Sequence, residues 1–342
     1  MKTRLLLTTL SIIVLFFPKP AAGQCSSFGG RSTVVQVNGL VPLVLSDTGN
    51  LDSTGGEKNA SSQDASVLGL VSGEVLFAET IGDGIYSVSQ ASVGALNLTV
   101  AGNTIGADFV IAHANADCGG DVPAVSGSSE IDGLVVNGWS IPVTGLPNQT
   151  ISLPGGVIMI LNEQTSSVQN QSGSMALNAI HIKSLALDVL IASPSASVFG
   201  PAGANRHQCD FFTGGGWIMS PSGKKATFGV SGGRRSDGTL FGHLEYFDHG
   251  FFPAPTGDTR VKVRGTDVLF YGGTGTARNV QGHANINGST SCPLGGPCNY
   301  AVDVTDNDPA GPDTFGIQTN YFDYAVPPTP LGGGNIKVHS CQ

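Results

Sequence analysis

The stretch CDFFTGGGWI (residues 209–218) opens the part of the chain that decides its fold. It is followed by the aromatic segment FGHLEYFDHG (residues 241–250), and the same part closes with GGNIKVHSC, which ends at Cys341. Between these segments, short runs of alternating apolar and polar residues are separated by Gly, Asn and Ser, a pattern typical of β-strands joined by turns. Aromatic side chains recur along the runs and supply much of the area to be buried. We therefore expect residues 209–342 to form a β-rich domain built as two packed layers or a barrel.

The same strand pattern, with fewer aromatic residues, begins at Ser32 and continues to residue 193. It predicts roughly nine or ten strands at the spacing of a β-sandwich or barrel. The alternation is imperfect at Ala95 and Leu96, where we expect a β-bulge. The stretch PSASVFGPAGANRHQ (residues 194–208) is rich in Pro, Gly and Ala and interrupts the pattern, so we interpret it as a linker.

The first 23 residues have the form of a secretory signal peptide. Lys2 and Arg4 precede an apolar run at residues 5–17, and the small residues Ala-Ala-Gly at 21–23 provide a cleavage site. The apolar run is shorter than the about 20 residues that a membrane-spanning helix needs. Cleavage near Gly23–Gln24 predicts a secreted, extracellular protein, and we expect no transmembrane anchor because no later apolar run is long enough.

The predicted organisation therefore has four segments. They are a signal peptide (1–23), a β-sandwich domain (24–193), a linker (194–208) and a C-terminal β-domain bracketed by a disulfide (209–342). The sequence thus predicts an all-β chain with two domains.

Charge and cysteine content restrict the class of protein further. The net charge is −9 and only 12% of the residues are charged, which argues against nucleic-acid binding because that needs a basic surface. Six cysteines in an exported chain favour disulfides over metal or redox chemistry. Among the fifteen arrangements that six cysteines allow, we predict the one that keeps each bridge within one domain. Its pairs are Cys25 with Cys118, Cys209 with Cys341, and Cys292 with Cys298.

Several motifs resemble those of a known family. The N-terminal motifs are SGSSEIDGLVVNG (126–138), VTGLPNQTISLPGGVIMILNEQ (143–164), ALNAIHI (176–182) and DVLIAS (188–193). Together they resemble the choice-of-anchor P family of exported bacterial proteins. The C-terminal part similarly resembles the β-domain often found after such modules, through CDFFTGGGWI, FGVSGG (228–233), FGHLEYFDHG, DTFGI (313–317) and GGNIKVHSC. The resemblance implies an exported context and transfers no catalytic residue or ligand to this chain.

The segment FGHLEYFDHG carries the densest group of polar side chains. On a strand, His243, Glu245 and His249 share one face, and they are the residues that a metal-dependent hydrolase would use. Along a straight strand, however, His243 and His249 lie about 20 Å apart, so a single site needs a bend at Asp248. We favour the alternative, in which the histidines form hydrogen bonds within an aromatic-lined sheet.

An acidic loop, DVTDNDPAGPDTF, offers a second candidate site. Its carboxylates Asp303, Asp306, Asp308 and Asp313 are the hard oxygen ligands that calcium prefers. Asp and Asn also occur in turns because their side chains hydrogen-bond to nearby backbone, and this interpretation is favoured. Calcium is nevertheless the best single prediction for a bound ion.

Two further features are open to more than one interpretation. The string GVSGG (229–233) fits the G-x-S-x-G pattern of a hydrolase nucleophile, but a hairpin follows it instead of the required helix, so we interpret it as a turn. Trp139 and Trp217 would suit a carbohydrate-stacking platform, although aromatic residues more often belong to the core.

The sequence thus predicts a non-catalytic extracellular protein with a binding or structural role. Its expected partner is a glycan or protein of a cell surface or matrix, and calcium is the expected stabilising ion. The alternative is the metal-dependent hydrolase that uses His243, Glu245 and His249.

Overall fold

The computed structural model describes residues 25–39, 42–67, 69–200, 209–235, 237–255 and 257–340. The secondary structure of this described portion is almost entirely antiparallel β, and its one helical element is a single 3-10 turn, η1 (Pro154–Gly156). The prediction of an all-β chain is therefore confirmed. The predicted signal peptide lies outside the described residues, as does Cys341 of the expected Cys209–Cys341 bridge.

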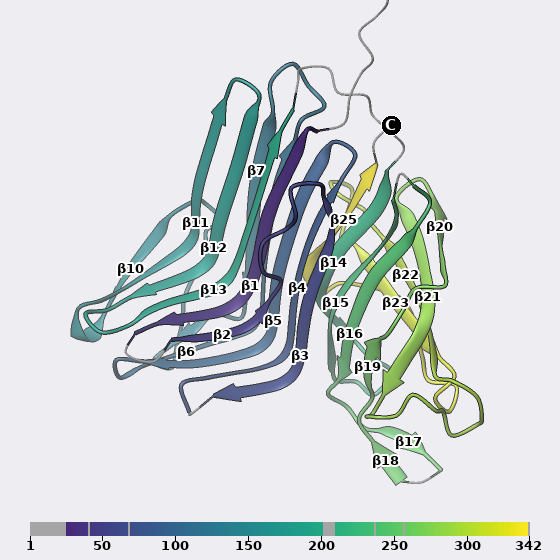
Figure 1. The fold of residues 1–342 in the computed structure, drawn as a ribbon. Helices are drawn as coiled ribbons and strands as arrows, with labels where there is room; N and C mark the ends of the chain where they lie inside the picture. The colour runs from purple at the N-terminus through teal and green to yellow at the C-terminus, as the bar shows by residue number, and fades with distance from the viewer. Residues whose placement is uncertain are drawn as a thin grey trace, which may run out of the picture.

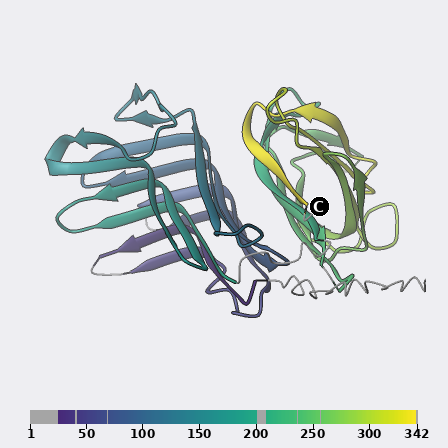
Figure 2. The same cartoon turned by 90° about the horizontal axis from the view of Figure 1, so that it is seen from above.

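The N-terminal part, residues 25–200, consists of two facing sheets (Figures 1 and 2). In spatial order, the six-stranded sheet contains β10 (Gln149–Leu153), β11 (Val157–Gln169), β12 (Ser172–Lys183), β13 (Asp188–Phe199), β1 (Ser27–Asn38) and β2 (Leu43–Asp47). The seven-stranded sheet contains β3 (Gly56–Val67), β4 (Val71–Asp83), β5 (Tyr86–Val100), β6 (Asn103–Asp117), β8 (Val135–Val136) and β9 (Trp139–Ser140), with β7 (Ala124–Asp132) also paired to β6.

The two sheets enclose an aliphatic core. Val35, Val93 and Ile191 are each at most 1% exposed and belong to one continuous cluster. Cys25 and Cys118 lie at the edge of this core, and their sulfurs are 2.03 Å apart, as expected for a disulfide. The bridge ties the first described residue of the chain to the end of β6.

The strands of both sheets bend sharply halfway along their length (Figure 1). In the seven-stranded sheet, Asp64 of β3 and Ala95 of β5 have positive φ angles of 53° and 48° and lie at the same level of the sheet. The pairing register is the same on either side of Ala95. The bulge expected at Ala95 is therefore a bend without an inserted residue. Asn162 and Ala192 repeat this arrangement in the six-stranded sheet, with φ of 52° and 51°.

The C-terminal part, residues 209–340, is a ten-stranded sheet curved into a half-barrel (Figure 2). Its spatial order is β24 (Ala325–Pro330), β23 (Thr314–Thr319), β22 (Asn299–Thr305), β21 (Ala277–Ile286), β19 (Lys262–Gly265), β16 (Leu240–Asp248), β15 (Lys225–Arg234), β14 (Asp210–Met219) and β25 (Gly333–Ser340), with β20 (Phe270–Thr274) paired to β21. A separate hairpin is formed by β17 (Phe252–Ala254) and β18 (Gly257–Thr259).

Aromatic side chains fill the half-barrel, as their number in the sequence indicated. Phe228 and Phe315 stack with ring centroids 3.8 Å apart, and Tyr246 stacks against Phe315 at 6.0 Å. All three are fully buried. A short disulfide, between Cys292 and Cys298 as expected, closes the loop between β21 and β22.

The seven-stranded sheet is a middle layer, because its second face packs against β14, β15 and β16 of the half-barrel. Glycines allow the close approach of these layers. A Cβ atom at Gly229 would lie 2.4 Å from Cγ of Phe77, and one at Gly215 would lie 3.3 Å from Ile111. The glycine-rich segments of β14 and β15 are therefore among the places where the two parts of the chain touch.

The predicted boundary between the parts needs a correction. Residues Pro194 to Phe199 of the expected linker belong to β13 and pair with both β1 and β12. Ala196 and Val198 are each 2% exposed and complete the core, so the alternation of small residues here serves a strand. Residues 201–208 lie outside the described part. No helix in the described part is long and apolar enough to span a membrane.

Candidate functional site

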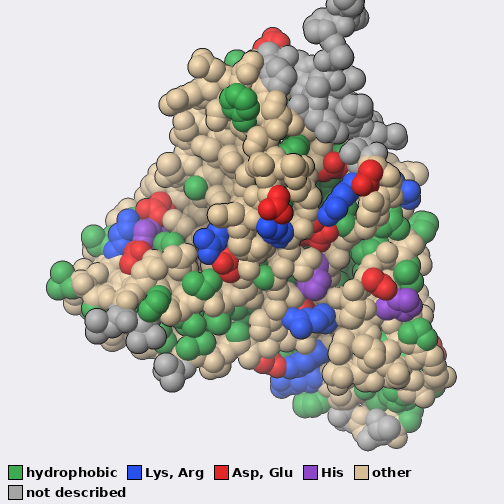
Figure 3. Space-filling view, in the orientation of Figure 1, with side chains coloured by type: hydrophobic (Ala, Val, Ile, Leu, Met, Phe, Trp, Pro, Cys, Tyr) green, Lys and Arg blue, Asp and Glu red, His purple; other side chains and the backbone are tan. Residues whose placement is uncertain are grey.

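The His243–Glu245 pair lies where β16 meets β3. Glu245 is 0% exposed. Its Oε1 accepts hydrogen bonds from Ser61 Oγ at 2.6 Å and from Arg264 Nε at 2.5 Å, and its Oε2 accepts one from Gln63 Nε2 at 2.6 Å. His243 Nε2 lies 2.7 Å from Ser61 Oγ and 3.6 Å from Glu245 Oε1. Charged side chains gather along this junction on the surface in Figure 3.

The buried carboxylate of Glu245 is ionised. Burial alone would raise its pKa, but hydrogen bonds from His243, Ser61 and Arg264 together lower the pKa below its ordinary value. Removing one member would leave a buried charge without its partner, at a cost of about 3–5 kcal/mol. We call these hydrogen-bonded residues the Glu245 group: Ser61, Gln63, His243, Glu245 and Arg264. The Glu245 group joins the middle layer to the half-barrel.

The Ser61–His243 distance is that of a nucleophile and its general base. In a catalytic triad, the acid binds the ring nitrogen that faces away from the serine and so fixes the orientation of the imidazole. Glu245 instead lies against the same nitrogen, Nε2, and accepts directly from Ser61. This geometry holds two sheets together and does not orient a base.

His249 lies in a different environment. Its Nδ1 is 2.8 Å from Glu74 Oε2, and its Nε2 is 3.2 Å from Thr227 Oγ1. The structure therefore brings His243 and Glu245 together but gives His249 other partners. Within the described residues, no group of three or more His, Cys, Asp or Glu side chains is arranged to hold a metal ion.

The serine of the GVSGG string is buried inside strand β15, so its interpretation as a turn was wrong. Ser231 Oγ donates to Glu79 Oε1 at 2.6 Å, and both residues are at most 1% exposed. The pKa of Glu79 is raised well above its ordinary value by burial and, secondarily, by the charge of Glu57. Gly229 of the same string lies against Phe77, where a Cβ atom would not fit.

Two aspartates of the acidic loop bind the free edge of β25. Asp313 Oδ2 accepts from the backbone nitrogen of Ile336 at 2.7 Å, and Asp306 Oδ2 accepts from that of Val338 at 3.0 Å. Asp313 Oδ1 also accepts from the backbone of Asn307 at 2.7 Å. These bonds close the seam of the half-barrel, where β25 has no strand neighbour beyond β14 in the described sheet.

The other two aspartates have separate partners. Asp303 Oδ1 accepts from Asn279 at 2.8 Å, and Asp308 Oδ2 accepts from Asn335 at 3.3 Å. Lys337 Nζ lies 3.4 Å from Asp306 and 3.9 Å from Asp308. Asp303 thus belongs to strand β22, and Asp308 contacts β25. Calcium binding stays a prediction from sequence.

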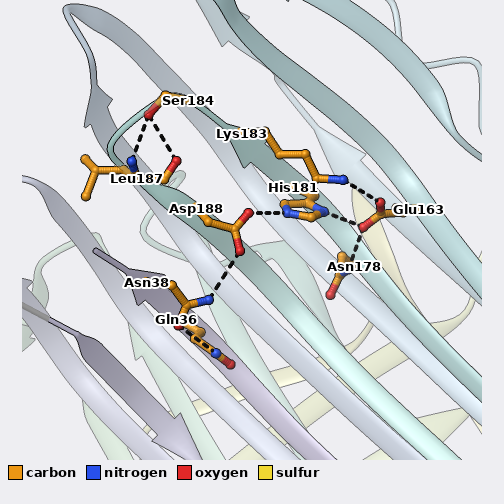
Figure 4. Close-up of polar contacts among 9 residues, drawn as sticks. All are labelled: Gln36, Asn38, Glu163, Asn178, His181, Lys183, Ser184, Leu187 and Asp188. Carbon is orange, nitrogen blue, oxygen red and sulfur yellow. Dashed lines mark hydrogen bonds and ion pairs between the residues drawn. The ribbon is translucent and has the colours of Figure 1, made fainter. Parts of the chain in front are cut away.

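A polar cluster that the sequence analysis did not identify crosses β11, β12 and β13 (Figure 4). His181 Nδ1 lies 2.5 Å from Glu163 Oε2, and its Nε2 lies 2.6 Å from Asp188 Oδ1. Lys183 and Asn178 also donate to Glu163. Because both ring nitrogens face carboxylates, the cluster cross-links three strands and leaves no nitrogen for a metal.

The two tryptophans differ in their surroundings. Trp217 donates from Nε1 to Asp132 at 2.7 Å, and Lys225 lies over its ring, 3.9 Å from the centroid. Trp217 is therefore a contact between the two parts. Trp139, at the β8–β9 turn, is 77% exposed.

A cleft of about 440 Å³ lies between the middle layer and β25. On the middle layer, His113 of β6 pairs with Ser128 of β7, and Asn115 pairs with Ser126. Because alternate residues of a strand share a face, these four side chains point the same way, toward the half-barrel. The intervening Ala114 is 0% exposed and faces the core.

The opposite wall is formed by alternate residues of β25. Ile336 is fully buried inside the half-barrel, so Lys337 and His339 face the cleft. His339 stacks on Phe211 at 4.6 Å, and Tyr86 meets its ring edge-on at 5.9 Å. The cleft is thus lined by polar groups on rigid strands with an aromatic end.

Two polar atoms beside this cleft have no hydrogen-bond partner within the described structure. They are His113 Nε2 and Asn115 Oδ1, and neither has solvent-exposed surface. Burial lowers the pKa of His113 to about 4, and Lys337 adds to the effect. Burial, His113 and Lys337 lower the pKa of His339 to about 3. Both imidazoles are therefore neutral at pH 7.

Comparisons with known proteins give little further guidance. No protein-family model matches the chain, and no curated protein matches it. A solved structure from Nitrosomonas europaea, described as "a putative AttH", is 9% identical over 91% of this chain and 92% of that chain. Its TM-score of 0.17 is too low to support a conclusion about fold or function.

Proposed function

We propose that the chain is an exported, non-catalytic binding protein whose binding site is the cleft between β6, β7 and β25. The observation that carries this proposal is the pair of unpartnered polar atoms, His113 Nε2 and Asn115 Oδ1, at a cleft of about 440 Å³. Buried polar atoms in proteins almost always have partners, and a cleft of this size suits a small ligand.

The rigidity of the frame supports a binding role. The cleft walls are strands, and strands hold side chains in a more fixed geometry than loops do. The Glu245 group and the Trp217–Asp132 contact fix the half-barrel against the middle layer. The strand backbone of these walls is therefore already in place before a ligand binds.

Export and membership of the choice-of-anchor P family are part of this proposal. They rest on the signal-peptide pattern, on the motifs quoted above and on the disulfides of the β fold, which suit an oxidising compartment. Mass spectrometry of the protein released by an exporting host tests the first point. A mature N-terminus at Gln24 supports export, whereas a retained Met1 in the cytoplasm contradicts it.

The binding proposal is tested by a screen of the purified mature protein against glycans and cell-surface proteins. The variant Asn115→Leu is screened beside the wild type, with Gln281→Ala on the exposed side of β21 as control. We expect a ligand that binds the wild type and the control but not Asn115→Leu. Absence of any ligand for the wild type would count against a binding role. Zinc that stays bound in stoichiometric amount after dialysis would support the hydrolase alternative.

A further inference from the structure

We infer that the cleft between β6, β7 and β25 takes a neutral, hydroxyl-rich ligand, that is, a sugar residue of a glycan. This inference rests on the proposed binding function and adds the chemical class of the ligand. It follows from the hydrogen-bonding needs, the charge and the shape of the residues that line the cleft.

The hydrogen-bonding groups require a ligand that both donates and accepts. Asn115 Oδ1 can only accept, so its partner must be a donor. A neutral His113 carries one donor and one acceptor nitrogen. The hydroxyls of Ser126 and Ser128 accept or donate according to their partner. A hydroxyl group satisfies all of these at once, and sugars present several hydroxyls close together.

The charges near the cleft disfavour an anion such as phosphate. Lys337 is the one cation among the residues that line it in the described structure. Its Nζ already lies 3.4 Å from Asp306 and 3.9 Å from Asp308, so its charge is largely compensated. His113 and His339 add no positive charge to the cleft, because both imidazoles are neutral at pH 7.

A transition-metal ion is disfavoured by the same surroundings. Imidazoles are good ligands for such ions, and His113 and His339 face one cleft. However, no carboxylate or thiolate lines the described cleft to complete the ligand set. A neutral ligand needs no such set.

The aromatic end of the cleft completes the match. Tyr86 and His339 meet edge-on, and Val88 and Val338 lie beside them. A sugar ring carries apolar C–H faces as well as hydroxyls, so it would pack on these side chains while its hydroxyls reach the polar row. Since His113 Nε2 and Asn115 Oδ1 are covered, binding includes the rotation of a lining side chain.

The test is titration calorimetry of the mature protein with a panel of neutral mono- and disaccharides. Inorganic phosphate and zinc chloride serve as the competing chemistries. We expect at least one sugar to bind, with an affinity that changes less than about twofold between low and high salt, because a neutral ligand is not screened. Asn115→Leu should weaken binding at least about tenfold, as expected when a hydrogen bond worth about 1.4 kcal/mol is lost. Ser128→Ala is a second variant, and Gln281→Ala is the control.

A property of the free variant separates loss of binding from loss of fold. Asn115→Leu removes a covered acceptor that has no partner, so its melting temperature should be unchanged or higher. A sugar that binds the wild type and Asn115→Leu equally would overturn the site assignment. Preferential binding of phosphate or zinc would overturn the ligand class. If no sugar binds but a surface protein does, the inference fails and the binding function stands.

Discussion

Asp313 accepts a hydrogen bond from the backbone nitrogen of Ile336, 2.7 Å away, across the open seam of the half-barrel. An edge strand normally presents unpaired N–H groups, which invite pairing with other chains. In this protein, a carboxylate takes the place of the missing strand, and Asp306 does the same at Val338. The acidic loop that first indicated a metal site therefore also has a structural role.

The seam predicts a specific effect of Asp313→Ala. The substitution leaves the backbone nitrogens of Ile336 and Asn307 without their acceptor, and each unsatisfied donor costs about 1–3 kcal/mol. We expect the free energy of unfolding in urea to fall by roughly 2–4 kcal/mol, and hydrogen exchange at Ile336 to become fast. Asp303→Ala, an exposed aspartate in the preceding strand, is the control. Unchanged hydrogen exchange at Ile336 in Asp313→Ala would show that the Asp313 carboxylate does not protect this backbone nitrogen.

Calcium provides a second test of the same loop. Asp306 and Asp313 already accept hydrogen bonds from backbone nitrogens of β25. We therefore expect the melting temperature to be the same in millimolar calcium as in a chelator. A ligand that binds only the folded state raises stability according to its concentration and affinity. A rise in melting temperature with calcium, absent in Asp308→Ala, would therefore establish the calcium site that the sequence predicted.

Buried Glu79 predicts a pH dependence of stability. Its pKa is raised in the folded state, so the native protein holds a proton that the unfolded chain releases near the ordinary value of 4.5. Stability should then fall as pH rises above about 4.5, until the raised pKa of the folded state is passed. Glu79→Gln should flatten this dependence and stabilise the protein at pH 8 by on the order of 1–3 kcal/mol. Urea unfolding of both proteins at pH 5 and pH 8 measures the effect, and a Glu79→Gln variant less stable than the wild type at pH 8 would contradict the prediction.

The contact of Gly229 with Phe77 predicts that even a methyl group is too large at this position. A Cβ atom at residue 229 would lie 2.4 Å from Phe77 Cγ, and overpacking of this kind costs about 1–3 kcal/mol. Gly229→Ala should lower the stability of the protein by that amount. The double variant with Phe77→Leu should recover part of the loss, and additive effects would show that the two residues do not couple.

Much of the fold follows from the sequence, because strand alternation and turn residues are local signals. The Cys25–Cys118 and Cys292–Cys298 pairs could likewise be predicted, because this pairing keeps each bridge within one predicted domain. The bends at Ala95 and Ala192 could not be predicted, since alanine is not a residue that favours positive φ. Both residues adopt it inside strands that are paired on both sides.

The candidate site was harder to predict than the fold. FGHLEYFDHG drew attention because its polar residues are dense, but the structure uses His243 and Glu245 as a joint between sheets. The cleft had a fainter signal in HANAD (residues 113–117), where polar residues alternate with alanine. Only the register of β6 with β7 and the packing of β25 bring His113, Asn115 and His339 together.

The most direct test of the binding site is to observe the imidazole nitrogens of the histidines by nuclear magnetic resonance during titration with the ligand that the screen identifies. We expect the signals of His113 and His339 to shift in proportion to occupancy. The signals of His181, in the cross-linked cluster of the outer sheet, should stay in place. Shifts at His181 or at other histidines, with His113 and His339 unchanged, would contradict the assignment of the cleft as the binding site.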